Sequence, residues 1–346
     1  MRTLPVRLDA PDRDVVAEGA RVLREGGLVA FPTDTVYGIA AAADDDAACQ
    51  RLYGAKERPA ARPCAYLLPD RDAWVAHVPA LPPLARRLAD RWWPGPLTLV
   101  VADAEGRLTG LRLPADGLSR RLARAAGRPL LQTSANRSGE PPATDAAGVR
   151  AALGDRVDLL LDAGPTPGRL PSTVVEVDAR RFALLRAGAI GEEEILRTAC
   201  DTYLVVCTGN ICRSPLAQAL LRREVAALLR CEPDEVLPRG YRFLSAGTHA
   251  VDGITVTESA EIAGLELNVQ LRDHRSRRFD PELLAGARRV YGMERAHTEL
   301  LQPYFADRPA ALALLDPEGG VAKRIRAACV RRAEEIVAAS AGPAAE

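Results

Sequence analysis

Residues 205–217, VVCTGNICRSPLA, contain an apolar strand, a short loop with a cysteine at each end, and a helix that begins at Ser-Pro. Cys207 and Arg213 stand at the ends of a C-x5-R pattern. The N–H groups of such a loop converge with the helix N-terminus on one point, where a dianion is favoured. The stretch therefore predicts a phosphate site at the start of an α/β domain.

Each residue type in this loop suits phosphate chemistry. Gly209 permits a tight turn, and Asn210 tolerates an unusual backbone angle while its amide pins the loop. The planar fork of Arg213 matches two phosphate oxygens. The same positive field favours the thiolate form of Cys207, which makes this cysteine a candidate nucleophile.

The segments after residue 200 alternate between strand-like and helix-like patterns, which predicts a doubly wound parallel sheet. With Gly-Asn inside the loop and Arg-Ser-Pro after it, residues 201–340 resemble the low-molecular-weight protein tyrosine phosphatase family. The resemblance implies a catalytic set without a cofactor: Cys207, Arg213 and Asp316. Asp316, in LLDPEGG, would protonate the leaving oxygen and then activate water.

The resemblance also assigns the phosphate loop. Its other members are Thr208, Gly209, Asn210, Ile211, Cys212 and Ser214. In the family the residues at the positions of Asn210 and Ser214 orient the loop and stabilise the thiolate. Cys212 would be the neighbouring thiol that traps an oxidised Cys207 reversibly.

The substrate of the second half is ambiguous from the sequence. Phosphotyrosine enzymes of this family wall their pocket with aromatic rings, whereas EGG follows Asp316-Pro317 and THAV follows the SAG turn here. The Asp-Pro-x-Gly-Gly ending resembles the bacterial arginine phosphatases, yet those carry threonine where Ile211 stands. We favour a phosphotyrosine protein substrate, with phosphoarginine as the alternative. Arsenate reduction is disfavoured, because only Cys231 and Cys329 follow Cys212 as relay thiols.

The first half alternates strands and helices too, but three strands bunch at its end, which predicts an α/β domain with a mixed sheet. Helices are predicted over 12–25 and 83–92, among others. No Pro- or Ser-rich linker separates the halves. We therefore expect two domains, residues 1–198 and 199–346.

Short motifs in the first half place cations and hydroxyls around strand ends. They are FPTDTVYG (31–38), KERP (56–59), LRLP (111–114), SANRSG (134–139), PSTVV (171–175) and RAGAI (186–190). Lys56 is one of only two lysines among 46 basic residues. Cations for phosphates together with clustered hydroxyls indicate a nucleotide pocket.

Together these motifs resemble the YrdC-like threonylcarbamoyl-AMP synthase family, over about residues 10–190. The resemblance implies that ATP, L-threonine and bicarbonate become threonylcarbamoyl-AMP, the precursor of threonylcarbamoyladenosine in tRNA. Charge on the phosphates would be neutralised by lysine, arginine and Mg²⁺. The implied ATP-binding residues are Lys56, Arg58, Arg62, Ser134, Asn136 and Arg186. The implied threonine-binding residues are Thr35, Arg112 and Ser172.

The charge balance and the cysteine content limit which partners and which cellular compartment we expect. Basic and acidic residues number 27 and 26 through residue 198, then 19 and 20, so neither half has the basic surplus of a strong nucleic-acid binder. Separate proteins would then carry the intermediate to tRNA. The seven scattered cysteines suit a reduced cytoplasm. Without a C-x-x-C pair, a secretory signal or a long apolar run, neither a metal site nor a membrane span is expected.

Two hypotheses follow from the whole chain. The first is a bifunctional enzyme that joins threonylcarbamoyl-AMP synthase to a protein phosphatase with a cysteine nucleophile. The alternative is a phosphoarginine phosphatase with an N-terminal nucleotide- or RNA-binding regulatory domain. Pyrophosphate release from ATP that depends on threonine distinguishes the two.

Overall fold

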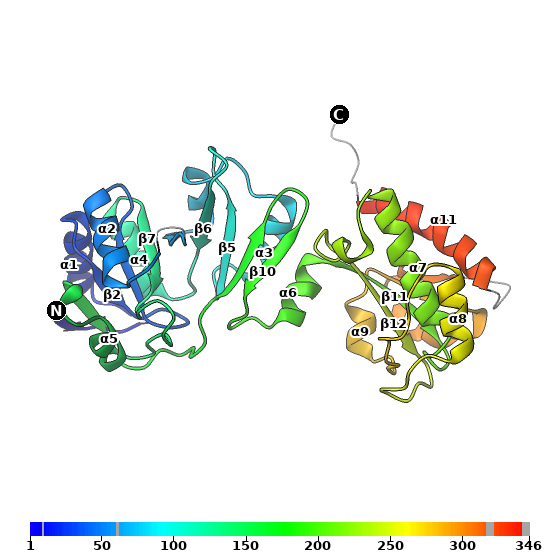
Figure 1. The fold of residues 1–346 in the computed structure, drawn as a ribbon. Helices are drawn as coiled ribbons and strands as arrows, with labels where there is room; N and C mark the ends of the chain where they lie inside the picture. The colour runs from blue at the N-terminus through cyan, green and yellow to red at the C-terminus, as the bar shows by residue number, and fades with distance from the viewer. Residues whose placement is uncertain (9, 60–61, 316–321, 341–346) are drawn as a thin grey trace. The chain divides into compact units, whose positions relative to one another are not determined.

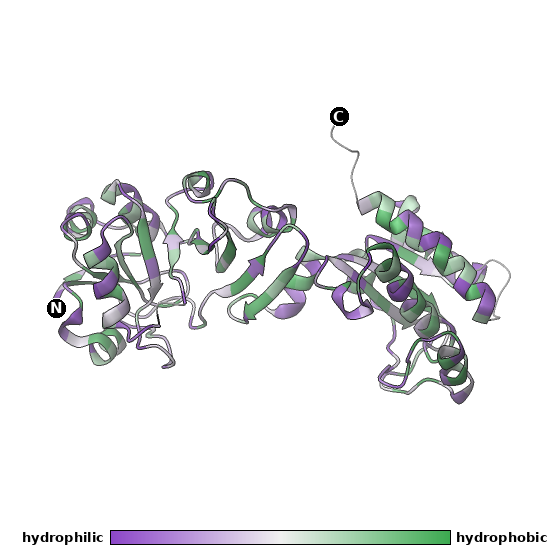
Figure 2. Cartoon of the chain, turned by 45° about the horizontal axis from the view of Figure 1, so that its top comes forward, coloured by the Kyte–Doolittle hydropathy of each residue, from purple (hydrophilic) through white to green (hydrophobic). Residues whose placement is uncertain are grey.

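The computed structural model describes residues 1–8, 10–59, 62–315 and 322–340 (Figure 1). The chain divides into two compact units, Met1–Ala199 and Cys200–Glu346. Each unit has its own hydrophobic clusters, in which strand side chains pack against helices. In Figure 2 the central strands are largely green, whereas the helices alternate between hydrophobic and hydrophilic residues along their length.

The first unit is an α/β fold whose sheet is mixed, which confirms the predicted class. Its helices are α1 (Arg13–Arg24), α2 (Asp46–Ala55), α3 (Pro83–Trp92), α4 (Gly117–Ala126), α5 (Ala146–Leu153) and α6 (Glu192–Ala199). Its strands are β1 (Arg2–Pro5), β2 (Val29–Phe31), β3 (Gly38–Ala42), β4 (Ala65–Leu67), β5 (Leu97–Ala102), β6 (Leu108–Arg112), β7 (Leu130–Ser134), β8 (Leu159–Asp162), β9 (Thr173–Val177) and β10 (Phe182–Arg186). The sheet order is β1-β8-β2-β3-β7-β4-β6-β5-β9-β10.

Aspartate caps fix where several helices of the first unit begin. The carboxylate of Asp45 accepts a hydrogen bond from the N–H of Ala48 at 3.0 Å, and that of Asp116 accepts one from Ser119 at 2.7 Å. Such a cap satisfies a backbone donor that the helix leaves unpaired. Helices α1 and α4 cover one face of the sheet, and α2 and α5 cover the other. The helices predicted over 12–25 and 83–92 are α1 and α3.

Strand β3 was not predicted, and it decides where the first site lies. Its sequence, GIAAA, lacks the β-branched and aromatic residues that are typical of strands, although all five residues are buried. It pairs antiparallel with β2 and with β7, so the segment from Pro32 to Tyr37 must cross the end of the sheet. The same end receives the last residues of β7, because Gly38 pairs with Ser134.

The second unit has a four-stranded parallel sheet in its described part, as predicted. The strands are β11 (Asp201–Cys207), β12 (Tyr241–Gly247), β13 (Arg289–Gly292) and β14 (Leu312–Leu314), in the order β12-β11-β13-β14. The helices are α7 (Arg213–Leu228), α8 (Glu258–Glu266), α9 (Pro281–Ala285), α10 (Arg295–Leu301) and α11 (Ala322–Ser340). Helices α7 and α11 pack on one face, and α9 and α10 on the other. None of the described helices is both long and apolar enough to cross a membrane.

Candidate functional sites

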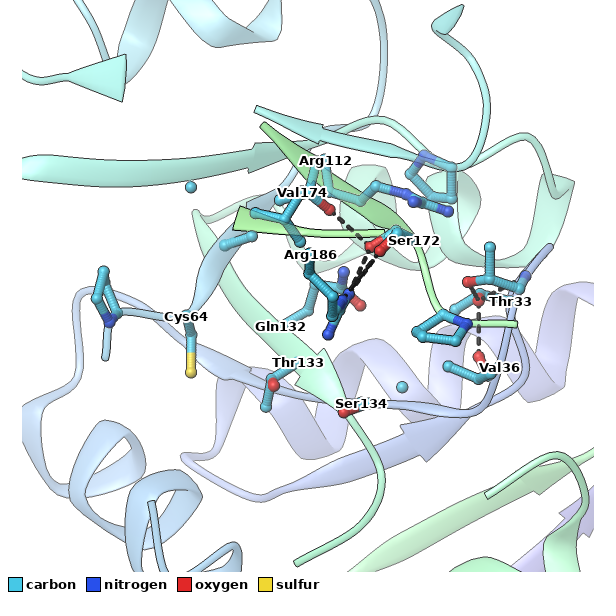
Figure 3. A pocket seen from close by; sticks show the side chains of 18 of the residues that line it. Thr33, Val36, Cys64, Arg112, Gln132, Thr133, Ser134, Ser172, Val174 and Arg186 are labelled. Atoms are coloured by element: carbon cyan, nitrogen blue, oxygen red, sulfur yellow. Dashed lines mark hydrogen bonds between the residues drawn. The ribbon is translucent and has the colours of Figure 1, made fainter. Parts of the chain in front are cut away.

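The first unit contains a pocket where the Thr33–Tyr37 segment meets the ends of β6, β7 and β9 (Figure 3). Its wall brings together six of the side chains that the sequence singled out. They are Thr35, Arg58, Arg112, Ser134, Ser172 and Arg186. The sequence reading assigned no binding role to Thr33 and Gln132, which also line this pocket. These residues come from distant parts of the chain, so only the fold assembles the pocket.

Arg112 is the most distinctive side chain of this pocket. It is 2% exposed, and its Nη2 donates to the Oδ1 of Asp34 at 2.6 Å. Within the described residues, its Nε and Nη1 are buried without a hydrogen-bond partner. A buried donor without a partner costs about 1–3 kcal/mol, and more when the group is charged. An oxygen of a bound anion that accepts from either donor would remove part of that cost.

The hydroxyls near Arg112 are held in place by a compact turn. The Oγ1 of Thr33 donates to the carbonyl of Val36 at 2.7 Å and accepts from the N–H of Thr35 at 3.1 Å. The two threonine hydroxyls lie 3.0 Å apart and are both buried. Because the turn is fixed by these bonds, the Thr35 hydroxyl is positioned before any ligand arrives.

A second arginine borders the pocket from β10. The Nη2 of Arg186 donates to the carbonyl of Ser172 at 2.7 Å and to its Oγ at 3.1 Å. The Ser172 hydroxyl also lies 2.9 Å from that of Thr98. Desolvation, and then the charges of Arg112 and Arg58, lower the pKa of Arg186 below its usual value. An anion in the pocket would relieve this repulsion.

Arg58 reaches the pocket from the segment after α2. Its Nε donates to the carbonyl of Arg62 at 2.7 Å, and its Nη2 donates to that of Pro63 at 3.0 Å. The guanidinium is therefore held by backbone oxygens while it lines the pocket wall. The Arg62 residue is exposed and is absent from the lining, which differs from the expectation of an ATP contact. The carbonyl of Arg62 anchors the guanidinium of Arg58 at this wall.

Lys56 and Asn136 also differ from the expectation, because neither lines the pocket. Lys56 is 1% exposed, and its ammonium donates to the carbonyls of Ser134 and Asn136. The Nδ2 of Asn136 donates to the carbonyls of Arg137 and Glu140 at 2.8 and 2.7 Å. The hydrogen bonds of both side chains therefore stabilise the conformation of the SANRSG loop (134–139). A buried cation next to backbone carbonyls is stabilised there, which explains why Lys56 turns away from the cavity.

The burial of Lys56 predicts a pH dependence of stability. Burial, and then the charge of Arg58, lowers the pKa of Lys56 to about 8 from its unfolded value of 10.5. Between these values the unfolded chain binds more protons than the folded one, so this residue favours folding increasingly as the pH rises from 8 to 10.5. We expect the free energy of unfolding of wild type minus that of Lys56→Met to grow over this window, by up to about 3 kcal/mol. Chemical denaturation at several pH values measures it, and a constant difference would contradict the prediction.

The second site is built by the turn from β11 into α7. Cys207 ends the strand and is 3% exposed, while Arg213 begins the helix. Asn210 has a φ of 53°, in the left-handed region that asparagine tolerates. The Cys207 sulfur lies 3.0 Å from the Oγ of Ser214, and it accepts the N–H of Asn210 at 3.3 Å. The N–H of Asn210 stabilises negative charge on the sulfur, and the Ser214 hydroxyl adds to this when it donates to the sulfur.

Asn210 ties the loop to the rest of the unit. Its Nδ2 donates to the hydroxyls of Ser214 and Ser245, each at 2.9 Å. Its Oδ1 accepts the N–H of Arg277 at 2.9 Å, and its carbonyl lies 2.8 Å from the Nε2 of His274. Asn210 and Ser214 are both fully buried. A fully satisfied buried network of this kind rigidifies the loop around the sulfur.

Gly247, at the end of β12, is required by the close approach of the loop. A Cβ on this residue would lie 2.6 Å from the carbonyl oxygen of Thr208 and 3.0 Å from the N–H nitrogen of Asn210. The contacting atoms belong to the backbone of the cysteine loop, so they could move away only if the loop itself moved. The SAG turn and the cysteine loop can therefore pack this closely only with glycine at this position. The remaining members of the predicted loop lie as expected along the turn. Ile211 is half-buried, and Cys212 is exposed at the start of α7.

The sequence reading missed two polar partners of this loop. Glu294 accepts from the Nη1 and Nη2 of Arg213 at 3.0 and 3.2 Å. The Nε2 of His297 lies 2.9 Å from the Oγ1 of Thr208. The hydrogen bond from Arg213 lowers the pKa of Glu294. Both follow β13 at the carboxyl edge of the parallel sheet, where ligand-binding residues gather, and that signal could have revealed them. Asp316, the expected general acid, lies outside the described residues.

Two family models match separate parts of the chain, one within each unit. A family model described as telomere recombination, for Sua5, YciO and YrdC proteins, matches residues 21–188. A model described as low molecular weight phosphotyrosine protein phosphatase matches residues 202–317.

Two relatives resemble the first unit. The chain is 37% identical over 185 residues to threonylcarbamoyl-AMP synthase of Pyrococcus abyssi, with 51% of this chain and 54% of that protein covered. It is 39% identical over 191 residues to a putative threonylcarbamoyl-AMP synthase of Mycobacterium tuberculosis, with 52% and 86% covered. The chain therefore spans about half the length of the first relative and most of the second.

A solved structure of P. abyssi Sua5 complexed with L-threonine also resembles this chain. The two align over 97% of this chain and 98% of the other, with a TM-score of 0.54 at 22% identity. At this identity the similarity establishes the fold alone.

Proposed function

The chain belongs to the threonylcarbamoyl-AMP synthase family through its first unit and carries a low-molecular-weight phosphotyrosine phosphatase domain in its second, and from this we propose that it is a bifunctional enzyme. The first unit would form threonylcarbamoyl-AMP and pyrophosphate from ATP, L-threonine and bicarbonate. The second would hydrolyse phosphomonoesters of proteins. The alternative of a purely regulatory first unit is not favoured, because the relatives of that unit are named synthases.

The observation that carries the synthase proposal is that, within the described ranges, the Nε and Nη1 of Arg112 are buried without a partner. Either donor suits an oxygen of the threonine carboxylate, while the hydroxyls of Thr35 and Ser172 lie in the same pocket for its polar groups. The related P. abyssi protein is described as bound to L-threonine, which supports this choice. Arg58, Arg186 and Ser134 would then hold the phosphates and ribose of ATP.

The proposed reaction is attack by the carbamate oxygen of threonine carbamate on the α-phosphorus of ATP, with pyrophosphate as the leaving group. Negative charge grows on the phosphate oxygens during this step. Fixed guanidinium groups aimed at that position stabilise it without reorganisation. Arg58 and Arg186 are both held by backbone carbonyls, so they are suited to this role. Lys56 would contribute by holding the Ser134 loop.

Mg²⁺ is a proposal that rests on the chemistry of ATP alone. Among the described residues, the pocket lining contains no carboxylate, and Asp34 behind it is occupied by Arg112 and by the N–H of Ala115. Magnesium prefers carboxylate and phosphate oxygens. The residues present do not fit a magnesium site of their own, so no step of the mechanism depends on one here.

Threonine-dependent release of pyrophosphate tests the first activity. We expect the full chain to release pyrophosphate from ATP only when threonine and bicarbonate are both present. Arg58→Ala should reduce kcat/KM by about 10²-fold, because one fixed charge on the transferring phosphate is lost. Arg107→Ala is the control, since Arg107 is exposed and pairs with Asp103 and Glu105 outside the pocket. Threonine-independent turnover by the wild type would contradict the proposal.

The phosphatase proposal is carried by the contacts of the Cys207 sulfur with Ser214 and with the N–H of Asn210. The thiolate would attack phosphorus and form a phosphocysteine, as the bond from phosphorus to the ester oxygen breaks. Asp316 would give its proton to that oxygen, then take one from the water that hydrolyses the phosphocysteine. Arg213 would bind the oxygens of the phosphoryl group. Cys212, exposed beside Cys207 in the loop, would protect it as a reversible disulfide after oxidation.

Phosphotyrosine proteins are the proposed substrates, and turnover of phosphotyrosine and phosphoarginine peptides compared side by side decides between the two chemistries. We further propose that the first product serves the threonylcarbamoyladenosine modification of tRNA, through separate transfer proteins. A cytoplasmic location is proposed as well, because the structure pairs none of the seven cysteines in a disulfide.

A further inference from the structure

The five residues after β13, Met293–His297, contact both ends of the phosphate loop. Glu294 pairs with Arg213, near the end of the loop, and His297 contacts Thr208, near its beginning. Each contact joins distant parts of the sequence, since the first pair is 81 positions apart and the second pair is 89 positions apart. The short segment that follows the neighbouring parallel strand, β13, therefore contacts the phosphate loop near both of its ends.

The geometry of the Arg213–Glu294 pair leaves one edge of the guanidinium free. The carboxylate takes the edge formed by Nη1 and Nη2, at 3.0 and 3.2 Å. Within the described part of the chain, the Nε of Arg213 has no hydrogen-bond partner. A guanidinium has two edges that can each donate a pair of parallel hydrogen bonds. The second edge, formed by Nε and Nη2, therefore stays available to two oxygens of a phosphoryl group.

The position of Glu294 is itself fixed by its surroundings. A Cβ on Gly292 would lie 2.6 Å from the Cγ2 of Thr298 and 3.1 Å from its N–H nitrogen, so the turn packs tightly on the end of β13. His297 is 3% exposed, and its Nε2 lies 3.5 Å from the Oε1 of Glu294. The carboxylate is thus held on a rigid element, and Arg213 pairs with it from a helix start.

We propose that Glu294 is a positioning residue that fixes the fork of Arg213 in the orientation required for a phosphoryl group. The inference rests on the proposed phosphatase function of the second unit. An arginine held on one edge loses less conformational freedom when its other edge binds the substrate. Because Arg213 would contact the phosphoryl group before and during its transfer, loss of this positioning affects both binding and turnover.

The experiment uses the full chain with p-nitrophenyl phosphate as substrate and inorganic phosphate as competitor. Glu294→Gln keeps the size of the side chain and removes its charge. We expect this variant to raise the inhibition constant of phosphate and the KM by about tenfold, and to lower kcat by a similar factor, as loss of a charge-assisted hydrogen bond implies. Glu294→Asp, which retains the carboxylate, should restore part of the loss. Glu299→Gln is the matched control, because Glu299 lies exposed on the same helix, α10.

The outcomes separate positioning from a merely structural role. A smaller folded fraction would lower the apparent kcat but leave the KM and the inhibition constant unchanged, and that result overturns the proposal. Tighter phosphate binding by Glu294→Gln also overturns it, because Glu294 would then compete with the substrate for Arg213. Calorimetric binding of inorganic phosphate tests Glu294 without catalysis. If the wild type binds phosphate but hydrolyses no phosphomonoester, the phosphatase function fails while the positioning of Arg213 is still tested.

Discussion

Cys207→Ser is expected to abolish hydrolysis of aryl phosphates by the full chain, with a loss of at least about 10⁴-fold in kcat. The serine hydroxyl fits the space of the thiol, which is 3% exposed, but it stays protonated at neutral pH and is a far weaker nucleophile. The loop itself should persist, because Asn210 holds it through Ser214, Ser245 and Arg277. Inorganic phosphate should therefore still bind to this variant.

Two controls accompany the Cys207 measurement. Cys329→Ser replaces another buried cysteine of the same unit, one that is not part of the phosphate loop and whose thiol lies 3.6 Å from the carbonyl of Ala217 on α7. It should retain hydrolysis. The pyrophosphate release assay should be unaffected by Cys207→Ser, because the proposed synthase pocket lies wholly in the other unit. Hydrolysis by Cys207→Ser at even a hundredth of the wild-type rate would show that another nucleophile acts.

Arg112→Gln is expected to reduce the efficiency of the proposed synthase by about 10²–10³-fold, mainly through a higher KM for threonine. In the part of the chain that the structure describes, the buried guanidinium has two donors without partners. A desolvated pair between such a group and a carboxylate loses about 2–5 kcal/mol when one side is truncated. Glutamine removes the charge and keeps a polar amide, although it is shorter than the arginine whose Nη2 contacts Asp34. Initial rates at varied threonine and saturating ATP measure the effect.

The specificity of the Arg112 effect needs a second substrate and a second arginine. The KM for ATP should change by less than the KM for threonine, because Arg58 and Arg186 are the side chains assigned to phosphate. Arg107→Gln removes an exposed arginine just before β6, the strand that carries Arg112, and should leave both constants unchanged. An equal rise of both KM values, or a fall in melting temperature large enough to unfold the unit during the assay, would argue that Arg112 is structural.

Local patterns predicted much of both folds. Helix α3 was expected over 83–92 and spans Pro83–Trp92, since the proline begins it and amphipathic periodicity continues it. Strand β3, in contrast, consists of glycine, isoleucine and alanines, and its residues form a strand because β2 and β7 supply hydrogen bonds on both sides. Intrinsic preference is weak for such a segment, so its tertiary neighbours decide its conformation.

The two candidate sites differ in how far the sequence could describe them. The cysteine loop is local: the backbone angle of Asn210 and its contact with Ser214 arise within eight residues. The first-unit pocket is assembled from segments up to about 150 positions apart, so the sequence suggested its members without their directions. Lys56 illustrates the limit. Lysine is rare in this chain, and this marked the residue as important. The direction of its side chain, however, depends on backbone carbonyls about 80 positions away.

The sequence by itself determined the phosphate loop and the alternation of strands and helices, because hydrogen bonding and side-chain preference act over a few neighbouring residues. Tertiary structure alone decided that Glu294 and His297 meet the loop, since this requires β11 and β13 to lie side by side in register. It also decided that, among the described residues, two donors of Arg112 have no partner while the ammonium of Lys56 donates to the carbonyls of Ser134 and Asn136. A buried charged group is stable only with hydrogen-bonding partners, and the fold of the whole unit decides which partners lie within reach.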